Sequence, residues 1–488
     1  MAGLLIALLV VPLVATALSI VGGNRGRELA TIASGVASLV LAVIVVWHVR
    51  NGTELHTLNN WLHLDSLSGV FILATGLLYA TGSVFSVGYL RALADAPGHD
   101  RYARRYFAYL NLFGWTMLLV PLMNDFATLW VAVELTTIVS VLLVALDRTD
   151  AALEAAWKYV LIASVGLGIA LLGVIVLYAS GTHALGDSYL PRFASYIGAG
   201  TRLSQVPVEL AFLLAVVGFG TKVGLAPLHT WLPDAHSEAP SPVSALLSGA
   251  LLANAFYAIL RFYQVSEAAN GDRFARHVLL VFGAVSLVVA ALFVLQQENY
   301  KRLLAYSTIE HMGVIALGIG FGVRIAVAGA LFHVVNHAAA KGLAFFGSGS
   351  VLRRYGSKEI ADVKGAGSVL PFSGPMLLAA TLALAGLPVS GIFRSEFQIV
   401  VGGFSRPEYV WVTLLLVFVN VAFFGVVWHA GQMVLTRPDE GAVRGETSWL
   451  MVGAMAACLV VVVAFGVHQP TALKALLNHA ATLLGVGQ

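Results

Sequence analysis

Residues 217–249 read VGFGTKVGLAPLHTWLPDAHSEAPSPVSALLSG, and the rest of the chain is best understood outward from this stretch. It begins as an apolar helix suited to lipid, yet it carries Lys222, and Gly224 and Pro227 soon interrupt the helical pattern. A lysine at membrane depth costs several kcal/mol, and proline frees a carbonyl that protein or water must satisfy. A broken apolar helix with one ionisable group is typical of an ion pathway.

The composition of the chain is that of an integral membrane protein. Its 488 residues are 59% hydrophobic and only 11% charged, whereas soluble domains carry about 25% charged residues. Repeated apolar runs of about 20 residues indicate helices and exclude a β-barrel. The net charge of +3 gives no indication of nucleic-acid binding. The single cysteine, Cys458, excludes disulfides within the chain and cysteine-ligated iron–sulfur clusters.

The hydrophobic pattern predicts an all-α polytopic membrane protein with about fourteen transmembrane helices. The predicted spans are 2–22, 29–49, 64–89, 105–123, 125–146, 153–179, 208–232, 240–263, 275–296, 300–321, 324–352, 367–403, 409–435 and 448–468. No soluble domain separates them, so residues 1–488 are predicted to form a single transmembrane domain. The N-terminus lacks a basic region and is interpreted as a first span, not as a cleaved signal.

The loop charges and the broken spans predict the topology. About twice as many loop lysines and arginines fall on one face as on the other, which places both termini outside by the positive-inside rule. We expect the protein in the inner (cytoplasmic) membrane of a bacterial or archaeal cell. Spans 208–232 and 367–403 are both interrupted by a Gly-Leu-Pro-like break and cross in opposite directions. This predicts two inverted five-helix repeats, at about 105–265 and 275–435.

Glu134 lies about ten residues into its span, near the membrane midplane. One interpretation is a structural carboxyl that is hydrogen-bonded to a neighbouring helix. The alternative, which we favour because intramembrane carboxylates are usually functional, pairs Glu134 with Lys222 in the proton pathway. The opposite charges stabilise each other while burial opposes both, so a proton arriving nearby would switch the pair.

Three ionisable residues share one face of the span 324–352. His333, His337 and Lys341 follow an i, i+4, i+8 spacing. A zinc site is disfavoured because the intervening residues do not form the HExxH pattern, and no metal is predicted. Imidazole relays protons near neutral pH, so the spacing predicts a proton wire.

Further candidates come from two other spans. His311 is a relay candidate, and the adjacent Glu310 is equally well explained as a buried structural partner. Glu396, which follows the break at Gly386-Leu387-Pro388, is predicted to carry the proton at the exit side. Arg394 either tunes Glu396 or extends to the membrane surface, because residues i and i+2 do not face each other on a helix.

Four polar residues follow the break at Pro227: His229, Asp234, His236 and Glu238. They form either a solvated loop or a funnel for proton uptake, with His229 and Asp234 as the uptake or tuning candidates. No Rossmann fingerprint, P-loop, CxxC or nucleophile elbow is present, so no redox chemistry and no cofactor are expected in this chain.

Four stretches together resemble one family, the antiporter-like subunits of respiratory complex I. They are GFGTKVGLAPLHTWLPDAHSEAPSPVSALLSG, KRLLAYSTIEHMG, LFHVVNHAAAKGLAFFGSGSV and GLPVSGIFRSEF. The family includes multisubunit cation/proton antiporters and the membrane subunits of group 4 hydrogenases. The resemblance covers residues 100–405. The amino-acid sequences of two of these stretches, IEHMG and NHAAAKGLAFF, look closest to the hydrogenase-4/formate hydrogenlyase type of membrane subunit.

The resemblance implies fourteen helices with inverted repeats and two broken helices. It also implies that Glu134, Lys222, the 333–341 relay and Glu396 match the proton-carrying positions of the family. One departure concerns the span 240–263, where many relatives carry a lysine or histidine. Ser248, Ala253 and Asn254 stand there, so the link from Lys222 to the relay is expected to depend on water or to be weakened. The long C-terminal lateral helix of some relatives is not expected, because only about 20 residues follow the last span.

Two functions of different classes follow. The first is a proton-translocating, non-catalytic subunit of an energy-converting oxidoreductase of the hydrogenase or NADH:quinone oxidoreductase type. Its partners would be other membrane subunits and soluble redox subunits that hold iron–sulfur clusters and a nickel–iron or flavin centre. The alternative is a subunit of a multisubunit Na⁺/H⁺ or K⁺/H⁺ antiporter without a redox partner. A third interpretation keeps the fold as a scaffold with a dry pathway.

Overall fold

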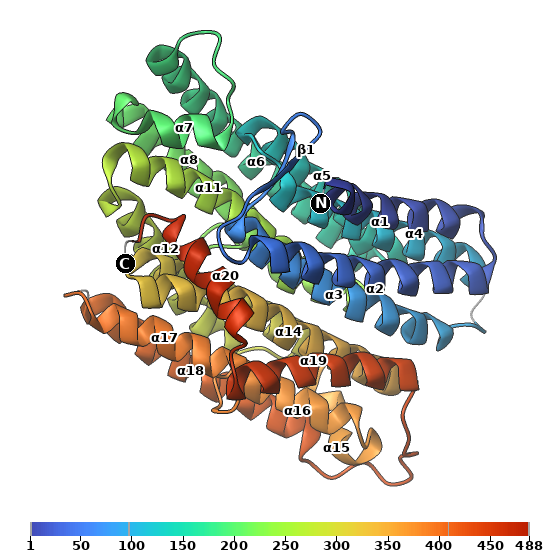
Figure 1. Cartoon of the computed structure of the whole chain (residues 1–488). Helices are drawn as coiled ribbons and strands as arrows, with labels where there is room; N and C mark the ends of the chain where they lie inside the picture. The colour runs from blue at the N-terminus through green and yellow to red at the C-terminus, as the bar shows by residue number, and fades with distance from the viewer. Residues whose placement is uncertain (1, 96–97, 408, 487–488) are drawn as a thin grey trace.

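The computed structural model describes residues 2–95, 98–407 and 409–486. Its long helices run side by side in one bundle, in which helices from the last third of the chain pack against the helix at residues 66–91 from the first third (Figure 1). This confirms the predicted all-α membrane fold.

The described elements of the first half of the chain are α1 (Ala2–Val21), α2 (Asn24–Val49), β1 (Leu55–Thr57), β2 (Leu62–Leu64), α3 (Ser66–Arg91), α4 (His99–Leu119), η1 (Val120–Leu122), α5 (Phe126–Val144), η2 (Ala145–Asp147), α6 (Asp150–Leu185), α7 (Phe193–Ala199), η3 (Gly200–Arg202), α8 (Gln205–Val223), α9 (Leu232–Glu238), α10 (Ser241–Leu246), η4 (Leu247–Leu251) and α11 (Leu252–Asn270). Those of the second half are α12 (Arg273–Val294), α13 (Tyr300–Gly320), α14 (Arg324–Tyr355), η5 (Ile360–Asp362), α15 (Ala366–Val369), α16 (Ser373–Leu384), α17 (Gly391–Phe404), α18 (Tyr409–Val434), α19 (Trp449–Val467) and α20 (Thr471–Thr482).

Eleven helical segments of the described residues are long and apolar enough to cross a membrane. One of them joins α10, the π-helical turn η4 and α11 into 30 continuous residues, Ser241–Asn270. The long helices α4 and α14 fall outside this set, as do the two shorter helices α16 and α17. The count of fourteen spans and the two inverted repeats therefore stay predictions.

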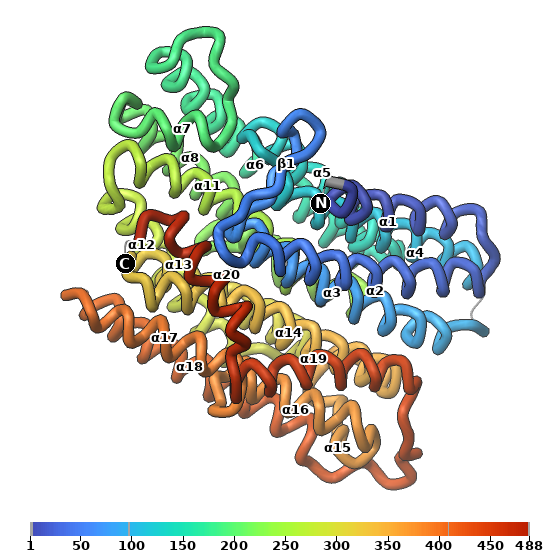
Figure 2. Tube along the Cα trace, viewed as in Figure 1, coloured from blue at the N-terminus to red at the C-terminus, as the bar shows by residue number. Residues whose placement is uncertain are grey.

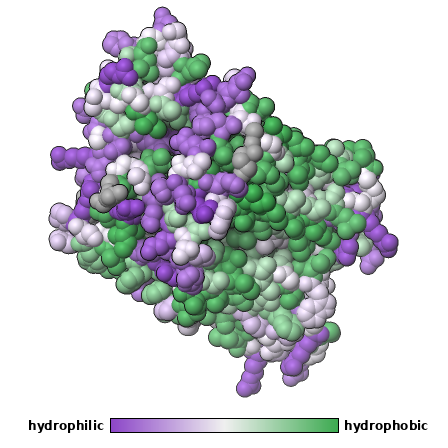
Figure 3. Space-filling model, in the orientation of Figure 1, coloured by the Kyte–Doolittle hydropathy of each residue, from purple (hydrophilic) through white to green (hydrophobic). Residues whose placement is uncertain are grey.

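The bundle has a protein-facing centre and a lipid-facing rim. The segments Ser241–Asn270 and Tyr300–Gly320 are buried throughout the apolar part of their length, whereas α1, α18 and α19 bury only about a third of theirs. The outer helices carry exposed apolar side chains, such as Val165 and Trp428. Figure 3 shows a broad hydrophobic band that is flanked by hydrophilic ends. This distribution is what a chain needs to lie in lipid while burying polar groups inside.

Both predicted helix breaks are present. Helix α8 ends at Val223 because Gly224 adopts a left-handed conformation (φ 80°), which glycine tolerates without steric cost. Helix α16 ends at Leu384, Gly386 is also left-handed (φ 73°), and α17 starts at Gly391. The first break therefore begins at Gly224, the first of the two residues that were predicted to interrupt the span 208–232.

The sequence pattern missed several short elements. Residues 55–64 form an antiparallel hairpin, β1–β2, and α7 follows the long helix α6. The 12-residue helix α20 follows the last long span and packs against α3 and α14 (Figure 2). Short segments such as these contain too few residues to show a clear period.

A buried polar cluster joins the start of α3 to α11. The Asp65 side chain accepts a hydrogen bond from Ser68 N (2.8 Å) and so caps α3. The Arg261 guanidinium binds both Asp65 carboxylate oxygens, each at 2.8 Å, and also donates to Gln264 Oε1 (2.8 Å). Burial opposes ionisation of Asp65, but the Arg261 charge outweighs it and holds the pKa of the Asp65 carboxyl well below its ordinary value.

This cluster yields a stability prediction. Asp65→Asn keeps a good capping side chain but leaves the Arg261 guanidinium buried without a counter-charge. We expect the free energy of unfolding, measured by denaturation in mixed micelles, to fall by about 3–5 kcal/mol. The control is Arg91→Gln, which breaks the Arg91–Glu28 pair (2.6 Å), where the Arg91 side chain is 58% exposed. Its cost is expected to be below about 1 kcal/mol, and equal losses in both variants would contradict the assignment.

Candidate functional site

Lys222 lies in the last turn of α8 and is completely buried. Its ammonium group donates to Thr137 Oγ1 on α5 (2.8 Å) and to the Tyr159 hydroxyl on α6. The Tyr159 ring also lies under the ammonium, 4.6 Å from Nζ to the ring centroid. These contacts supply the hydrogen bonds and partial charge that lipid cannot offer to a buried cation.

Close approach of α6 and α8 makes these contacts possible. A Cβ on Gly218 would lie 2.4 Å from the backbone nitrogen of Ala170, and one on Gly166 would lie 2.5 Å from Thr221 Cβ. Both positions therefore require glycine, as is common where membrane helices touch.

The broken backbone of α8 is satisfied by protein groups. Trp231 Nε1 donates to the Thr221 carbonyl (2.8 Å), and the Ala226 amide donates to Ser286 Oγ (2.9 Å). The Trp231 ring also stacks on Tyr159 at 4.3 Å between ring centroids. Non-helical backbone at this depth is tolerated only with such partners.

Glu134 lies on α5, three residues before Thr137 and so on the same face of the helix. Its Oε2 atom is buried without a hydrogen-bond partner among the described residues. Glu134 interacts electrostatically with Lys222, although no described carboxylate lies within 4.0 Å of the Lys222 ammonium, and the pairing of the two residues in the proton pathway stays a prediction. The Thr137 hydroxyl takes the place next to Lys222, because its shorter side chain lies one turn nearer.

The relay residues of α13 and α14 meet in the centre of the bundle, all of them buried. His311 Nδ1 and His333 Nε2 are 3.0 Å apart, a hydrogen-bond distance at which either ring can donate. The ring centroid of His337 lies 5.1 Å from that of His311, and neither His337 nitrogen has a partner among the described residues. Lys341 donates to the Leu304 carbonyl (2.9 Å) and to Ser307 Oγ (3.0 Å).

Glu396 lies where the relay reaches the second break. His333 Nδ1 is 2.9 Å from Ser395 Oγ, and Glu396 Oε1 is 3.9 Å from His311 Nδ1. The Glu396 side chain is 12% exposed and lines a cavity of about 430 Å³ together with Phe393, Phe397 and Asn420. The relay therefore ends at a carboxylate that faces an opening between α17 and α18.

The second break is also held by side chains. Asn336 Nδ2 donates to the Gly391 carbonyl (2.9 Å), and Ser390 Oγ accepts from the Phe393 amide (3.1 Å) to cap α17. A Cβ on Gly391 would lie 2.1 Å from Asn336 Oδ1, so this close contact requires glycine.

Two secondary candidates receive different placements. Glu310 is buried and interacts electrostatically with Lys341 and Glu396, although no described cation lies within 4.0 Å of it. Arg394 does not reach Glu396: it donates to the carbonyl of Val467 (3.4 Å) at the end of α19. A tuning role for Arg394 is not supported by this geometry, because the two side chains leave α17 in different directions.

The four polar residues after the first break do not form a solvated loop. Asp234 pairs with Lys158 (3.0 Å) and Arg302 (2.6 Å), and Glu238 pairs with Lys358 (2.8 Å). These ion pairs attach α9 to α6, α13 and the segment after α14. His229 is 8% exposed, and its ring lies 6.3 Å from that of Tyr306.

His236 is the residue that sequence reasoning undervalued. It is completely buried, its ring lies 6.4 Å from Trp231 and 5.7 Å from Phe345, and neither nitrogen has a partner among the described residues. It therefore stands between the Lys222 group and α14. The signal was available: on a helix, His236 points about 200° away from Asp234, so the two belong to different environments.

The predicted gap in the span 240–263 is partly filled by hydroxyl groups. Ser248 Oγ lies 2.7 Å from Thr308 Oγ1 on α13, next to the Ser307 that accepts from Lys341. Asn254 is committed elsewhere, donating to Thr75 Oγ1 (3.3 Å) and the Met117 carbonyl (3.0 Å).

His311, His333 and Glu396 offer three donor atoms within 4.8 Å of one another, the spacing of a possible metal site. Because His311 and His333 are at hydrogen-bond distance, the same atoms are equally suited to pass a proton between rings. The expectation of no metal at this place stays a prediction.

Comparison with known proteins agrees with the resemblance. Residues 123–425 match the family described as NADH:quinone oxidoreductase/Mrp antiporter, TM. The chain is 34% identical over 430 residues to a hydrogenase-4 component F homolog of Methylacidiphilum infernorum, covering 86% of this chain and 88% of that one. It spans about half the length of several other curated relatives.

Solved structures show the same fold. A chain of the Mrp complex from Dietzia sp. DQ12-45-1b superposes with a TM-score of 0.86 at 20% identity, covering 99% of this chain and 97% of that one. A chain of respiratory complex I from Thermus thermophilus superposes with a TM-score of 0.82 at 23% identity, covering 99% and 100%. The family match extends over most of the chain and includes both broken helices and the relay between them. The protein belongs to the NADH:quinone oxidoreductase/Mrp antiporter family of membrane subunits.

Proposed function

We propose that the chain is a proton-translocating membrane subunit of an energy-converting oxidoreductase complex of the hydrogenase-4 type. The observation that carries the proposal is a set of ionisable and hydroxyl groups between Glu134 and Glu396, of which Lys222, His311, His333, His337 and Lys341 are completely buried. Ionisable groups inside a membrane are costly, and a row of them is rare unless it conducts ions.

The proposed path begins at Glu134 and Lys222. Thr137 and Tyr159 hold the ammonium through neutral hydroxyl groups, so Lys222 is not locked into its charged form by a contacting carboxylate. His236 and the Ser248–Thr308 pair form the middle of the path, with water completing the contacts between side chains. Lys341, His337, His311 and His333 then lead to Glu396.

The two broken helices support a proposed repeat organisation. Lys222 lies in the last turn before its break and Glu396 lies within the first two turns after its own, as expected if helices of opposite direction contribute equivalent positions. We therefore propose residues 105–265 and 275–435 as inverted repeats. The basic loops would face the cytoplasm and the termini the outside of a bacterial or archaeal inner membrane.

No redox centre is proposed in this chain. Other membrane subunits would flank it in the lipid bilayer, and soluble partners would supply electron transfer through iron–sulfur clusters and a nickel–iron or flavin centre. The name of the M. infernorum relative supports the hydrogenase type. The alternative is an Mrp-like Na⁺/H⁺ or K⁺/H⁺ antiporter subunit, for which the shared fold is the supporting observation.

Gentle purification of the protein from its native membrane tests the choice between these functions. We expect mass spectrometry to find nickel–iron hydrogenase and iron–sulfur subunits with the chain. Recovery with membrane antiporter subunits alone would contradict the redox assignment and favour ion exchange.

Substitution at the start of the path tests proton transfer. Glu134→Gln and Lys222→Ala should each lower proton pumping at least tenfold in inverted vesicles. Pumping is measured by the fluorescence quenching of an acridine dye. Each substitution removes a group that must change charge, while assembly and H₂ or NADH oxidation by the complex are retained. Glu154→Gln is the control, because Glu154 is exposed and pairs only with Lys158 among the described residues. Unchanged pumping in both path variants would refute the pathway.

Substitution of His236 tests the proposed connection between Lys222 and the relay residues of α14. His236→Leu fills a similar volume without a proton-accepting nitrogen, and we expect pumping to fall at least tenfold in the same vesicles. His277→Leu is the matched control, since His277 is exposed and, among the described residues, hydrogen-bonds only to the Arg273 carbonyl of its own helix. If both variants pump like the unmodified protein, protons bypass His236.

A further inference from the structure

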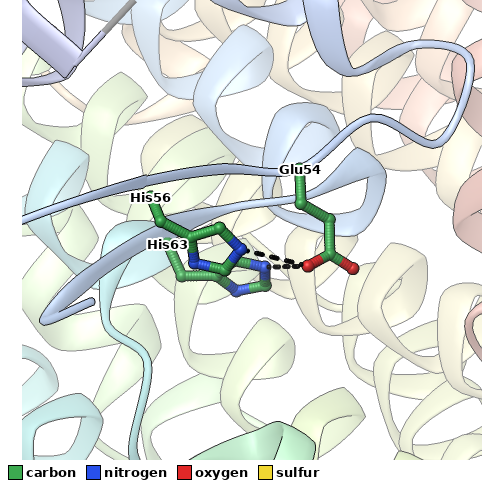
Figure 4. A group of neighbouring side chains, drawn as sticks. All are labelled: Glu54, His56 and His63. Atoms are coloured by element: carbon green, nitrogen blue, oxygen red, sulfur yellow. Dashed lines mark hydrogen bonds and ion pairs between the residues drawn. The ribbon is translucent and has the colours of Figure 1, made fainter.

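Three potential metal ligands gather on the hairpin between α2 and α3, away from the proposed proton path. Figure 4 shows Glu54, His56 and His63 with their polar ends turned toward one another. Glu54 Oε2 lies 3.3 Å from His56 Nε2 and 3.3 Å from His63 Nε2. The two imidazole rings stack with centroids 4.7 Å apart.

The local backbone explains this convergence. His56 on β1 is directly opposite His63 on β2 in the antiparallel register, so their side chains leave the same face of the hairpin. Glu54 precedes His56 by two residues in extended chain and shares that face. Strand pairing therefore brings the three side chains together without help from the helices.

Neighbouring residues hold the hairpin in place, so little conformational entropy would be lost when a metal ion binds. Leu62 on β2 pairs with Met123 before α5, Asn124 Nδ2 donates to the Asn60 carbonyl (2.8 Å), and Arg192 donates to the Asn59 carbonyl (2.9 Å). The turn and one strand are thus anchored, and the three donor atoms lie within 4.8 Å of one another before any ion arrives.

The donor set matches a particular class of ion. Two imidazole nitrogens and one carboxylate oxygen form a set that zinc uses with an open fourth position. At zinc–ligand distances of about 2.0–2.1 Å, ligands in a tetrahedron lie about 3.3 Å apart. The distances from Glu54 Oε2 to the two imidazole nitrogens are both 3.3 Å, which matches this ligand spacing.

The exposure of the three side chains is compatible with metal binding. The side chains of Glu54 and His56 are 49% and 39% exposed, so an ion and its water ligand can reach the site from solvent. The His63 side chain is 8% exposed and forms the inner wall.

We propose that Glu54, His56 and His63 bind one Zn²⁺ ion, or a divalent transition-metal ion with the same ligand preference. Binding would cross-link β1 to β2 and stiffen the hairpin against the start of α5, the helix that carries Glu134. This site is independent of the proposed proton path.

A metal titration of the purified full-length protein in detergent tests the proposal. After treatment with a chelator, Zn²⁺ is added in competition with a chromophoric chelator of known affinity. We expect one ion per chain, and X-ray absorption should show two nitrogen ligands at about 2.0 Å together with oxygen ligands. His56→Gln, His63→Gln and Glu54→Gln should each weaken binding at least tenfold.

His277→Gln is the matched control, since it removes an exposed histidine outside the hairpin and should leave the affinity unchanged. The melting temperature of each metal-free variant shows whether it is folded. His56→Gln serves this purpose best, because His56 is partly exposed and its removal leaves the core intact. Equal zinc affinity in the His56 and His63 variants and the unmodified protein, or no binding of one ion per chain, would overturn the proposal.

Discussion

The Lys222 ammonium group is completely buried, so protein groups must solvate it, and much of the first half of the bundle is arranged around that constraint. Helix α8 must end next to it, α6 must approach closely through Gly166 and Gly218, and Trp231 must close the opened backbone. The Trp231 ring also stacks on the Tyr159 ring, and the Tyr159 hydroxyl accepts a hydrogen bond from the Lys222 ammonium. The hydrogen bonds that Lys222 needs therefore require α5, α6 and α8 to pack closely at the point where α8 breaks.

The second break solves the same backbone problem with different side chains. An amide from α14, Asn336, satisfies the Gly391 carbonyl, while the Ser390 hydroxyl caps α17. Between the two helices Val389 has a positive φ of 79°, a strained conformation for a β-branched residue. Strain of this kind is commonly found next to functional groups, and Glu396 lies one and a half turns along α17.

The charged residues fall into two sets with different partners. Asp65 with Arg261, and Asp234 with Lys158 and Arg302, form direct ion pairs that join neighbouring helices. The buried lysines Lys222, Lys301 and Lys341 instead donate to hydroxyls and backbone carbonyls, and no described carboxylate lies within 4.0 Å of them. An ion pair fixes both charges, whereas a neutral partner leaves the protonation of a lysine responsive to its surroundings. The ion-paired residues are therefore suited to stabilising the fold, whereas buried lysines with neutral partners are suited to proton transfer.

Composition and hydrophobic periodicity were sufficient to predict a helical membrane bundle, its two interrupted helices and the face shared by His333, His337 and Lys341. These features are local, because lipid imposes length and apolarity on each helix and glycine and proline interrupt helices wherever they stand. The partners of each buried group were not predictable in this way. Thr137 beside Lys222, the buried position of His236 and the turning away of Arg394 depend on contacts between residues far apart in the chain. Such contacts follow from how helices pack in three dimensions, which a single sequence does not encode in its local pattern.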